Sequence, residues 1–430
     1  MASLPEATLR AGIAEIDITP GLGVGLAGQF HARVADSVES PLLVKAMALS
    51  CGGVTVLLIT CDVIMVPCAL VDPALDDIVV RTQVPRDHVV VSATHTHSGP
   101  ATMPHTGEAK VDRTWLDSVR RAIVAAAVDA VSHLAPARIA VGQGAVDGVC
   151  FNRRDRLGAG PTDPTVTSLL VETPAGVPIA FWANLSLHYV SAGSETAISS
   201  DYFGAVAERL GRLVGTSVHG QLTNGCSGDI NNVDPQRAVD VNGAERAELV
   251  ATAVAGAVAA ATMMAPRRDT VTISAVRREV IVDRVAITAQ DRVVAAQLMA
   301  GERTDAPFSY VSGPPLAESL RRRYAERLAV VDAMPVSAAT PVSVIAIGDL
   351  CLVGLPGEMF VEFGLDLRRR LPFPFVAPIG LAGDHIGYCP TEKAFDKGGY
   401  ETWRSPVNWT APGTGERLVD AAVSLMDGSH

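Results

Sequence analysis

Three strand-turn-strand segments recur along the 430-residue chain, and they constrain its fold more than any other feature. Each combines two apolar runs rich in β-branched residues with a short turn, which is the signature of a β-hairpin. The second strand of each hairpin leads into a polar residue, namely Asp62, His188 or Glu358. Because sheet-based enzymes usually display reacting groups at strand ends, these side chains are candidate functional residues. The hairpins are predicted over residues 42–62, 165–188 and 342–358. Their sequences differ too much to establish an internal repeat.

Helical periodicity fills the intervals between the strands. Residues 112–134 carry apolar side chains three to four positions apart and stop before Pro136, which indicates an amphipathic helix. No linker or charge block divides the chain, while residues 265–340 are the least regular and could form a small insertion. The sequence therefore predicts an α/β fold, with mixed β-sheets flanked by helices in one domain over residues 1–430. The other predicted helices span 201–214, 243–264, 315–333, 358–369 and 416–426.

Composition excludes several classes of partner. A net charge of −11 opposes binding to nucleic acid or to anionic lipid. Seven cysteines without a Cys-x-x-Cys pair suit free thiols in a reducing compartment. The N-terminal residues lack a signal-peptide core, and the uncharged stretch 249–266 is interpreted as a buried helix rather than a membrane span. We therefore expect a cytoplasmic protein with no stable membrane anchor.

Among ten histidines, only His95 and His97 are close neighbours. Their side chains share one face of an extended segment, because residues two apart in a strand point the same way. Catalytic zinc sites use about three protein ligands plus water, and imidazole is a common ligand. A polar loop without metal explains the same pair. In the same way, His188 could be a hydrogen-bonded core residue, and Glu358 could be an acid stabilised at a helix N-terminus.

The order of the polar motifs resembles the neutral/alkaline, non-lysosomal ceramidase family. The matching stretches are AGIAEIDITP (11–20), SATHTHSGP (92–100), NRR (152–154), His188 after FWANLSL, NGCSGDIN (224–231), LPGEMFVEFG (355–364) and GYCPT…GGYE (387–401). This resemblance implies a ceramidase-like catalytic domain that holds one zinc ion per chain and cleaves an amide bond. The implied zinc ligands are His95, His188, Glu358 and Tyr388. The implied catalytic and oxyanion-stabilising groups are His97, Arg153 and Tyr400.

The chemistry implied by this resemblance is hydrolysis by zinc-activated water, since zinc lowers the pKa of its water toward about 7. His97 is the candidate acid and base, and Arg153 is favoured over Arg154 as an oxyanion donor. Asp229 could orient a ligand or catalytic histidine, or could simply close an Asx-turn in a Gly-bearing loop.

Two departures from the family pattern bear on the substrate. Ceramidases carry a serine in the motif G-D-(hydrophobic)-S-P-N, where this chain has Asn231. Asparagine cannot act as a hydroxyl nucleophile, but it can hydrogen-bond a substrate. The chain also ends soon after the last motif, without the family's C-terminal immunoglobulin-like domain. We therefore expect a small-molecule amide that is smaller or more polar than ceramide.

Three functions remain open at this stage. The first is the zinc amidohydrolase. The second is an acyl-transfer or cyclising biosynthetic enzyme that uses the same zinc site. The third is a non-catalytic, zinc-stabilised binding protein, for which the missing serine is the argument. Oligomerisation is expected only from its general frequency among soluble proteins.

Overall fold

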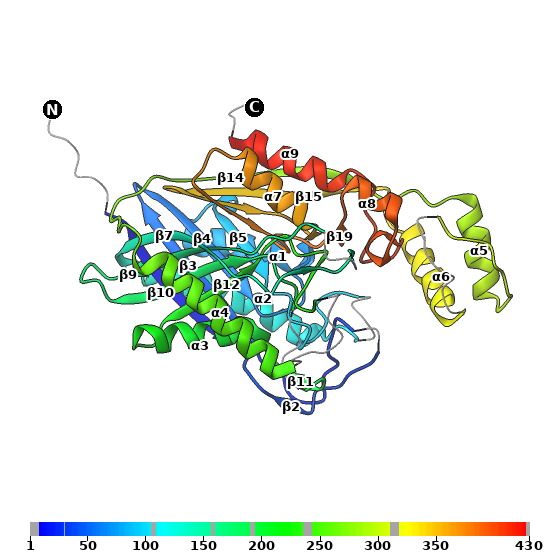
Figure 1. Cartoon of the computed structure of the whole chain (residues 1–430), viewed down its shortest axis with the longest axis horizontal. Coiled ribbons are helices and arrows are strands. Elements are labelled where there is room, and N and C mark those ends of the chain that lie inside the picture. The colour runs from blue at the N-terminus through cyan, green and yellow to red at the C-terminus, as the bar shows by residue number, and fades with distance from the viewer. Residues whose placement is uncertain are drawn as a thin grey trace.

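The computed structural model describes residues 8–29, 31–104, 109–155, 160–189, 194–234, 243–309 and 318–426. Within these residues, one order of elements occurs three times (Figure 1). Three antiparallel strands are followed by a helix, by a strand parallel to the third, and by a second helix. In each sheet the parallel strand lies beside the third antiparallel strand, so the three sheets share one strand order. An internal repeat that the sequence could not establish is thus visible in the topology.

The three repeats have the following elements in the described residues. The first contains β1 (Arg10–Asp17), β3 (Leu43–Cys51), β4 (Val54–Cys61), α1 (Cys68–Thr82), β5 (Val89–Ala93) and α2 (Arg113–Ser132). The second contains β7 (Arg138–Ala145), β9 (Thr165–Glu172), β10 (Pro178–Leu185), α3 (Asp201–Val214), β12 (His219–Asn224) and α4 (Gly243–Met263). The third contains β14 (Ile273–Asp283), β15 (Ser337–Ile347), β16 (Leu350–Gly354), α7 (Val361–Arg370), β18 (Phe375–Ile379) and α9 (Thr414–Met426).

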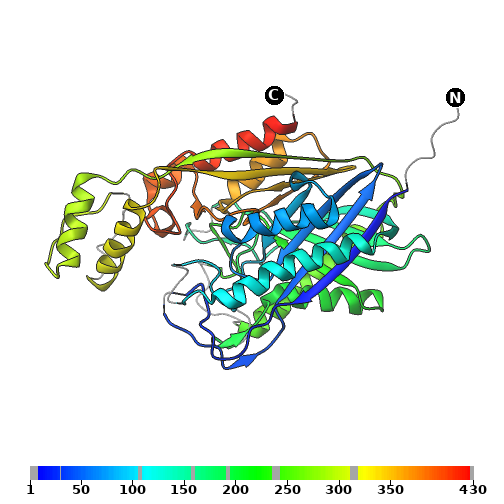
Figure 2. The same cartoon turned by 180° about the vertical axis from the view of Figure 1, so that it is seen from behind.

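Short elements lie in the connections and at the sheet edges. They are β2 (Ser37–Val38), η1 (Arg86–His88), β6 (Ala135–Pro136), β8 (Phe151–Asn152), β11 (Ala197–Ile198), β13 (Ile230–Asn231), β17 (Glu358–Met359), β19 (Tyr388–Cys389), α8 (Glu392–Lys397) and η2 (Tyr400–Thr402). A larger addition lies between β14 and β15, where α5 (Ala289–Met299) and α6 (Glu318–Asp332) project from one end of the molecule (Figures 1 and 2).

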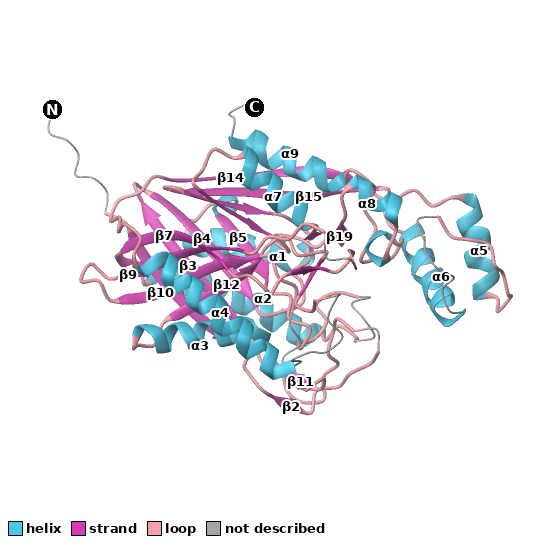
Figure 3. Cartoon of the chain, in the orientation of Figure 1, coloured by secondary structure: helices cyan, strands magenta, loops and turns pink. Residues whose placement is uncertain are grey.

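Alternating side chains explain why three sheets pack around one centre. In β4, Val56 and Leu58 join a core shared by all three sheets, while Leu57 and Ile59 pack toward α1 and α2. Successive strand residues point to opposite faces, so a strand covered on both faces is apolar throughout. The sheets thus face one another at the centre and carry their helices outside (Figure 3).

The helix α4 is the one described helix whose length and composition would suit a membrane span. Its residues Val250, Val254 and Val258 are fully buried in the core between the second sheet and its helices. This packing agrees with the buried helix expected over 249–266. No disulfide joins any of the seven cysteines in the structure, and six of the seven are buried.

The predicted α/β class and the three hairpins are confirmed. One local interpretation is wrong: Glu358 does not open a helix, because α7 begins only at Val361. Glu358 instead lies in β17, and its backbone partner across the short ladder is Tyr388 of β19. The range 265–340 is also more regular than expected, since it contains β14, α5, α6 and the start of β15.

Candidate metal centre and cavity

The site begins where β5 ends. His95 follows this strand with a left-handed backbone (φ 71°), which is unusual for a residue with a side chain. Its ring Nδ1 lies 2.6 Å from the carbonyl oxygen of Ile64, and its backbone N–H donates to Val63. Because a carbonyl oxygen can only accept, Nδ1 carries a hydrogen, and Nε2 is the ring nitrogen that points into the site. The strained backbone therefore holds the His95 ring in a fixed direction.

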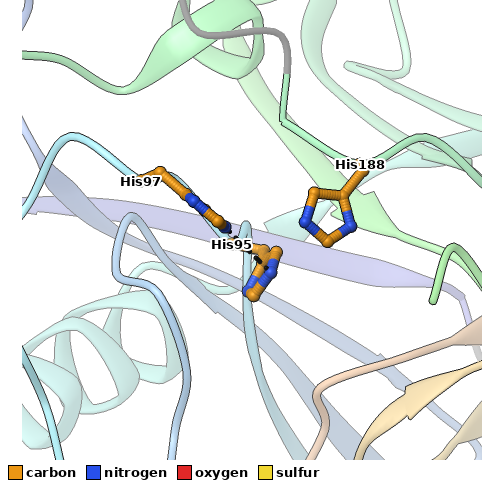
Figure 4. Close-up of side chains that lie close together, drawn as sticks. All are labelled: His95, His97 and His188. Atoms are coloured by element: carbon orange, nitrogen blue, oxygen red, sulfur yellow. Dashed lines mark hydrogen bonds between the residues drawn. The ribbon is translucent and has the colours of Figure 1, made fainter. Parts of the chain in front are cut away.

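Two further histidines lie beside the ring of His95 (Figure 4). The Nε2 atoms of His97 and His95 are 3.2 Å apart, and the ring of His188 is centred 4.6 Å from that of His95. His188 comes from the loop after β10, so two repeats contribute to the cluster. The candidate ligand atoms of all three histidines lie within 4.8 Å of one another, and all three residues are buried. Such a group could hold a metal ion.

A carboxylate from the third repeat completes the group. Glu358 is buried, and its Oε2 lies 3.4 Å from Nε2 of His95. The β17–β19 ladder sets Glu358 beside Tyr388, which explains how two residues 30 positions apart reach one point. On the other side, Nε2 of His385 lies 3.5 Å from Oε1 of Glu358. The three repeats therefore converge at the ends of their strands.

Burial controls the charge of these groups. It lowers the pKa of His97 and of His188 well below the ordinary value, and the nearby His95 adds to the effect. Burial alone would raise the pKa of Glu358, but His95 and His385 favour its charged form and hold the pKa well below the usual range. The cluster thus combines His97 and His188, in which burial favours the neutral ring, with the carboxylate of Glu358.

The donor set fits a metal ion. With Nδ1 of His95 bonded to Ile64, its Nε2 faces Oε2 of Glu358 at 3.4 Å and Nε2 of His97 at 3.2 Å. Oε2 of Glu358 and Nδ1 of His188 have no hydrogen-bond partner among the described residues. Ligands around tetrahedral zinc lie about 3.3–3.4 Å from one another, given bonds of about 2.0–2.1 Å. A cation at this point could bind the buried nitrogen and oxygen atoms that lack a hydrogen-bond partner.

A chain of phenols and a guanidinium lies next to the histidines. Tyr400 donates to the Tyr388 hydroxyl at 2.6 Å, and Arg153 donates to the Tyr400 hydroxyl at 2.8 Å. Glu401 accepts from Nε of Arg153 at 3.1 Å. Burial opposes the charge on Arg153, but Tyr400, Tyr388 and Glu401 hold its pKa well above the usual value. The structure thus brings Arg153, rather than Arg154, to the tyrosines.

Two predicted residues lie outside the cavity that the described residues form. Asp229 accepts from the Val361 backbone N–H at 2.8 Å and from the Asn152 side chain at 2.9 Å, so neither of these bonds reaches a histidine. Its backbone carbonyl accepts from Arg153 N–H, which makes it a support for the arginine segment. Asn231 pairs with Phe151 in the β13–β8 ladder. That ladder keeps Asn231 away from the lining, so the predicted substrate contact gains no support.

The cavity has a volume of about 270 Å³ and contains seven of the nine predicted site residues. Its lining includes Gly28 and Gln29 from the first repeat's β1–β3 connection. Arg153 comes from the equivalent β7–β9 connection, and Arg323 and Arg327 come from the α5–α6 addition between β14 and β15. The first connection of every repeat therefore reaches the same cavity. The predicted site residues in the lining are His95, His97, Arg153, His188, Glu358, Tyr388 and Tyr400.

Sequence reasoning missed three neighbours of the candidate catalytic groups. Tyr189 stacks on the His97 ring at 3.6 Å between centroids, and its hydroxyl accepts from Gln29. His385 contacts Glu358, and Glu401 binds both arginines of the 152–154 segment. The signals were present, because each missed residue lies within three positions of a predicted one. Nothing in the spacing separated these residues from ordinary loop residues.

We expect Gly28→Ala to disturb His97. A Cβ at Gly28 would lie 2.4 Å from Nδ1 of His97, so the ring must move. A displacement of about 1 Å at a reacting group can cost about 100-fold in rate. Gly23→Ala is the matched control, because Gly23 has a similar positive φ but nothing within 4 Å of its Cβ position. Measured kcat/KM should fall in the first variant and stay near wild type in the second; equal activities would show that the Gly28 contact is unimportant.

Comparison with solved structures shows that the chain has the fold of neutral ceramidases. The neutral ceramidase from Pseudomonas aeruginosa matches with a TM-score of 0.76 and 18% sequence identity, over 98% of this chain and 75% of that one. A structure described as ceramidase complexed with C2 matches with a TM-score of 0.75 and 17% identity, over 98% and 76% of the two chains. The sequence matches no family-level profile and no curated protein. The predicted ceramidase resemblance is therefore confirmed for the fold.

Proposed function

We propose that this chain is a zinc-dependent amidohydrolase that cleaves a small amide. The observation that carries the proposal is the buried convergence of three histidines and Glu358, whose candidate ligand atoms lie close together. Such an arrangement is stable when a cation lies among the ligands. The fold shared with neutral ceramidases supports amide chemistry at this point.

In this proposal His95, His188, Glu358 and Tyr388 hold the metal ion. Zinc suits a mixed nitrogen and oxygen donor set, and it supplies a nucleophilic water at neutral pH together with Lewis-acid polarisation of the amide carbonyl. The hydrogen bond from His95 to Ile64 fixes the tautomer of that ring, as carbonyl partners commonly do for metal-binding histidines.

The remaining groups move protons and stabilise charge. His97 is buried beside the ligands and accepts the proton of the attacking water, then returns a proton to the leaving nitrogen. Arg153 and Tyr400 donate to the oxygen that becomes negative in the tetrahedral intermediate. One C–O bond forms and the C–N bond breaks, so the products are a carboxylic acid and an amine.

The size of the cavity supports a small substrate. Its volume of about 270 Å³ lies just below the range of about 300–1,000 Å³ that is typical of ligand pockets. Apolar and aromatic residues form part of its wall, among them Ile64, Met65, Trp403 and Val407. A substrate with a short acyl chain fits these dimensions.

Metal analysis combined with a hydrolysis screen tests the proposal. We expect about one zinc ion per purified chain, loss of amide hydrolysis on chelation, and recovery on adding zinc. The screen covers N-acyl amines, N-acyl amino alcohols and cyclic amides, with a competing amine present to detect acyl transfer. A metal-free protein that hydrolyses amides would contradict the zinc site, and metal without turnover would contradict the hydrolase.

A further inference from the structure

A tight turn after Trp403 forms part of the cavity wall. Ser405 and Asn408 form an antiparallel bridge across it, and residues opposite each other in such a bridge carry their side chains on the same side. Trp403 has an extended backbone, and residues two apart in an extended segment also share a face. Arg404, which lies between Trp403 and Ser405, instead pairs with Asp291, which does not line the cavity. Trp403, Ser405 and Asn408 therefore share one face of the turn, and all three line the cavity.

Each of these three side chains has a buried polar atom without a hydrogen-bond partner among the described residues. The atoms are Nε1 of Trp403, Oγ of Ser405 and Oδ1 of Asn408. Ser405 is 4% exposed and Asn408 is 6% exposed. Buried polar groups in native proteins are nearly always hydrogen-bonded, because an unmet group costs free energy. Three unmet atoms on one face of a cavity wall therefore indicate a place where a ligand supplies the partners.

Asn408 fixes the hydrogen-bonding character of this face. Its Nδ2 donates to the backbone carbonyl oxygen of Tyr400 at 2.6 Å. Because a carbonyl oxygen only accepts, the amide nitrogen must face Tyr400, and Oδ1 is left as an acceptor. The indole N–H of Trp403 can only donate, whereas the Ser405 hydroxyl can donate or accept. The complementary group on the ligand must therefore both donate and accept hydrogen bonds.

This pattern selects an uncharged group. A carboxylate has only acceptors, so it would leave Oδ1 of Asn408 facing another acceptor. An ammonium has only donors, so it would leave the indole N–H of Trp403 unmet. A carboxamide has two N–H donors and a carbonyl acceptor on separate atoms, whereas a hydroxyl has one donor and accepts through the same oxygen. The carboxamide therefore offers more of the contacts that the three side chains require.

We infer that the substrate is a small diamide, in which one amide is cleaved and a second, uncharged amide binds Trp403, Ser405 and Asn408. The inference rests on the proposed amide hydrolysis and adds the substrate class to it. The position of the turn supports it, because Asn408 binds the backbone of Tyr400, a proposed oxyanion donor. The second amide is therefore held close to the bond that is cleaved.

Two matched substrate pairs test this inference. N-butanoylglycinamide is compared with N-isobutylbutanamide, in which an isopropyl group replaces the carboxamide on the amine side. N-ethylsuccinamide is compared with N-ethylisocaproamide, which makes the same replacement on the acyl side. Release of butanoate in the first pair and of ethylamine in the second reports cleavage of the secondary amide. For at least one pair, we expect the wild-type kcat/KM to be about 10–100-fold higher for the diamide, as two or three additional hydrogen bonds suggest.

Two further substrates define the group that is bound. They are the carboxylate and the alcohol that correspond to the preferred diamide, for example N-butanoylglycine and N-butanoylethanolamine. Both should be cleaved with a lower kcat/KM than the diamide. A preference for the carboxylate would overturn the uncharged subsite, and a preference for the alcohol would overturn the assignment of the carboxamide. Equal kcat/KM values within both matched pairs would overturn the inference.

The double variant Trp403→Phe/Ser405→Ala removes two of the three unmet atoms. Phenylalanine keeps an aromatic ring where Trp403 meets Tyr324 edge to face. We expect this variant to lose most of the preference for the diamide. Its unfolding temperature should stay near that of the wild type, because a buried polar atom without a partner does not stabilise the fold. A preference that survives in this variant would overturn the role of the two side chains.

Trp182→Phe/Ser168→Ala is the matched control variant. Nε1 of Trp182 and Oγ of Ser168 are also buried without a partner among the described residues. Both residues lie in the β9–β10 ladder, and neither lines the cavity. The control should keep the ratio of kcat/KM values within each pair, which does not depend on the fraction of folded enzyme. Loss of this ratio in the control would show that the preference does not arise at the turn.

A binding measurement separates this inference from the proposed hydrolysis. In γ-oxoheptanamide, CH₂ replaces the scissile NH of either diamide, so no secondary amide remains to be cleaved. Calorimetry should show that the zinc-loaded wild type binds this ketone more tightly than propyl isopentyl ketone, its isopropyl counterpart, and that Trp403→Phe/Ser405→Ala does not. If this difference is found but no amide is cleaved, the hydrolase proposal fails and the carboxamide subsite stands. If amides are cleaved without a difference in binding or in kcat/KM, the hydrolase stands and this inference fails.

Discussion

His188→Ala and His95→Ala are expected to lose the bound metal and at least about 1,000-fold in kcat/KM for amide hydrolysis. Each variant removes one proposed ligand, and the chemistry supplied by a bound metal contributes several kcal/mol to the barrier, at about 1.4 kcal/mol per tenfold. Both histidines are buried, so alanine leaves a small void and not an unpaired charge. Folding should therefore survive, as thermal unfolding and circular dichroism can show.

His88→Ala is the matched control for this expectation. His88 stands before β5 and His95 follows it, so the two histidines flank the same strand. Nδ1 of His88 contacts the Thr55 carbonyl at 2.9 Å, much as Nδ1 of His95 contacts that of Ile64. The control should keep its metal content and its activity. Wild-type activity in both His95→Ala and His188→Ala would contradict the proposed metal-dependent mechanism.

The strands and most helices could be predicted because their signals are local. Continuous apolar runs mark β9 and β10, and a repeat of three to four marks α2, within the windows that hydrophobic periodicity samples. The local environment of Glu358 could not be predicted in this way. Its partner Tyr388 is 30 positions away, and the two-residue ladder that joins them leaves no periodic pattern. The helix that the sequence suggests at Glu358 begins three residues later.

The candidate site was predictable where the motifs are distinctive. The His95–His97 pair indicated the candidate metal centre, and the spacing of Tyr388 and Tyr400 indicated the hydrogen-bonded tyrosines beside it. All four residues line the cavity. The arginines of α6 were not predictable, because two basic residues on a solvent-facing helix look like an ordinary charged surface. Arg323 and Arg327 line the cavity because of the position of α6, which the buried Asp291–Arg404 pair fixes from distant parts of the chain.

The three repeats account for this distribution of chemistry. Each sheet contributes loops at the same end, yet the repeats have diverged in what those loops carry. The second and third supply His188 and Glu358 after equivalent strands, whereas Asp62 of the first accepts from the Leu43 backbone N–H instead. The same fold, repeated three times, thus places different residues at one point. This explains why the candidate metal ligands are spread over most of the sequence.

Arg153→Gln is expected to lower kcat by about 100–1,000-fold without loss of metal. Its guanidinium donates to the Tyr400 hydroxyl at 2.8 Å and lies in the cavity beside the metal cluster. Removing one donor to a developing oxyanion typically costs about 2.7–4 kcal/mol. Because the loss arises in the transition state, KM should change far less than kcat. Steady-state kinetics with metal analysis on the same sample measures both effects.

Arg154→Gln is the control, and it also decides between the two neighbouring arginines. Arg154 shares Glu401 with Arg153, but its other hydrogen bonds go to the backbone carbonyls of Ala394 and Gly398, and it does not line the cavity. Its loss should therefore lower the unfolding temperature more than it lowers kcat per folded molecule. If Arg154→Gln instead loses kcat while Arg153→Gln keeps it, the oxyanion donor is Arg154, and the hydrogen bond from Arg153 to Tyr400 serves only to hold the tyrosine in place.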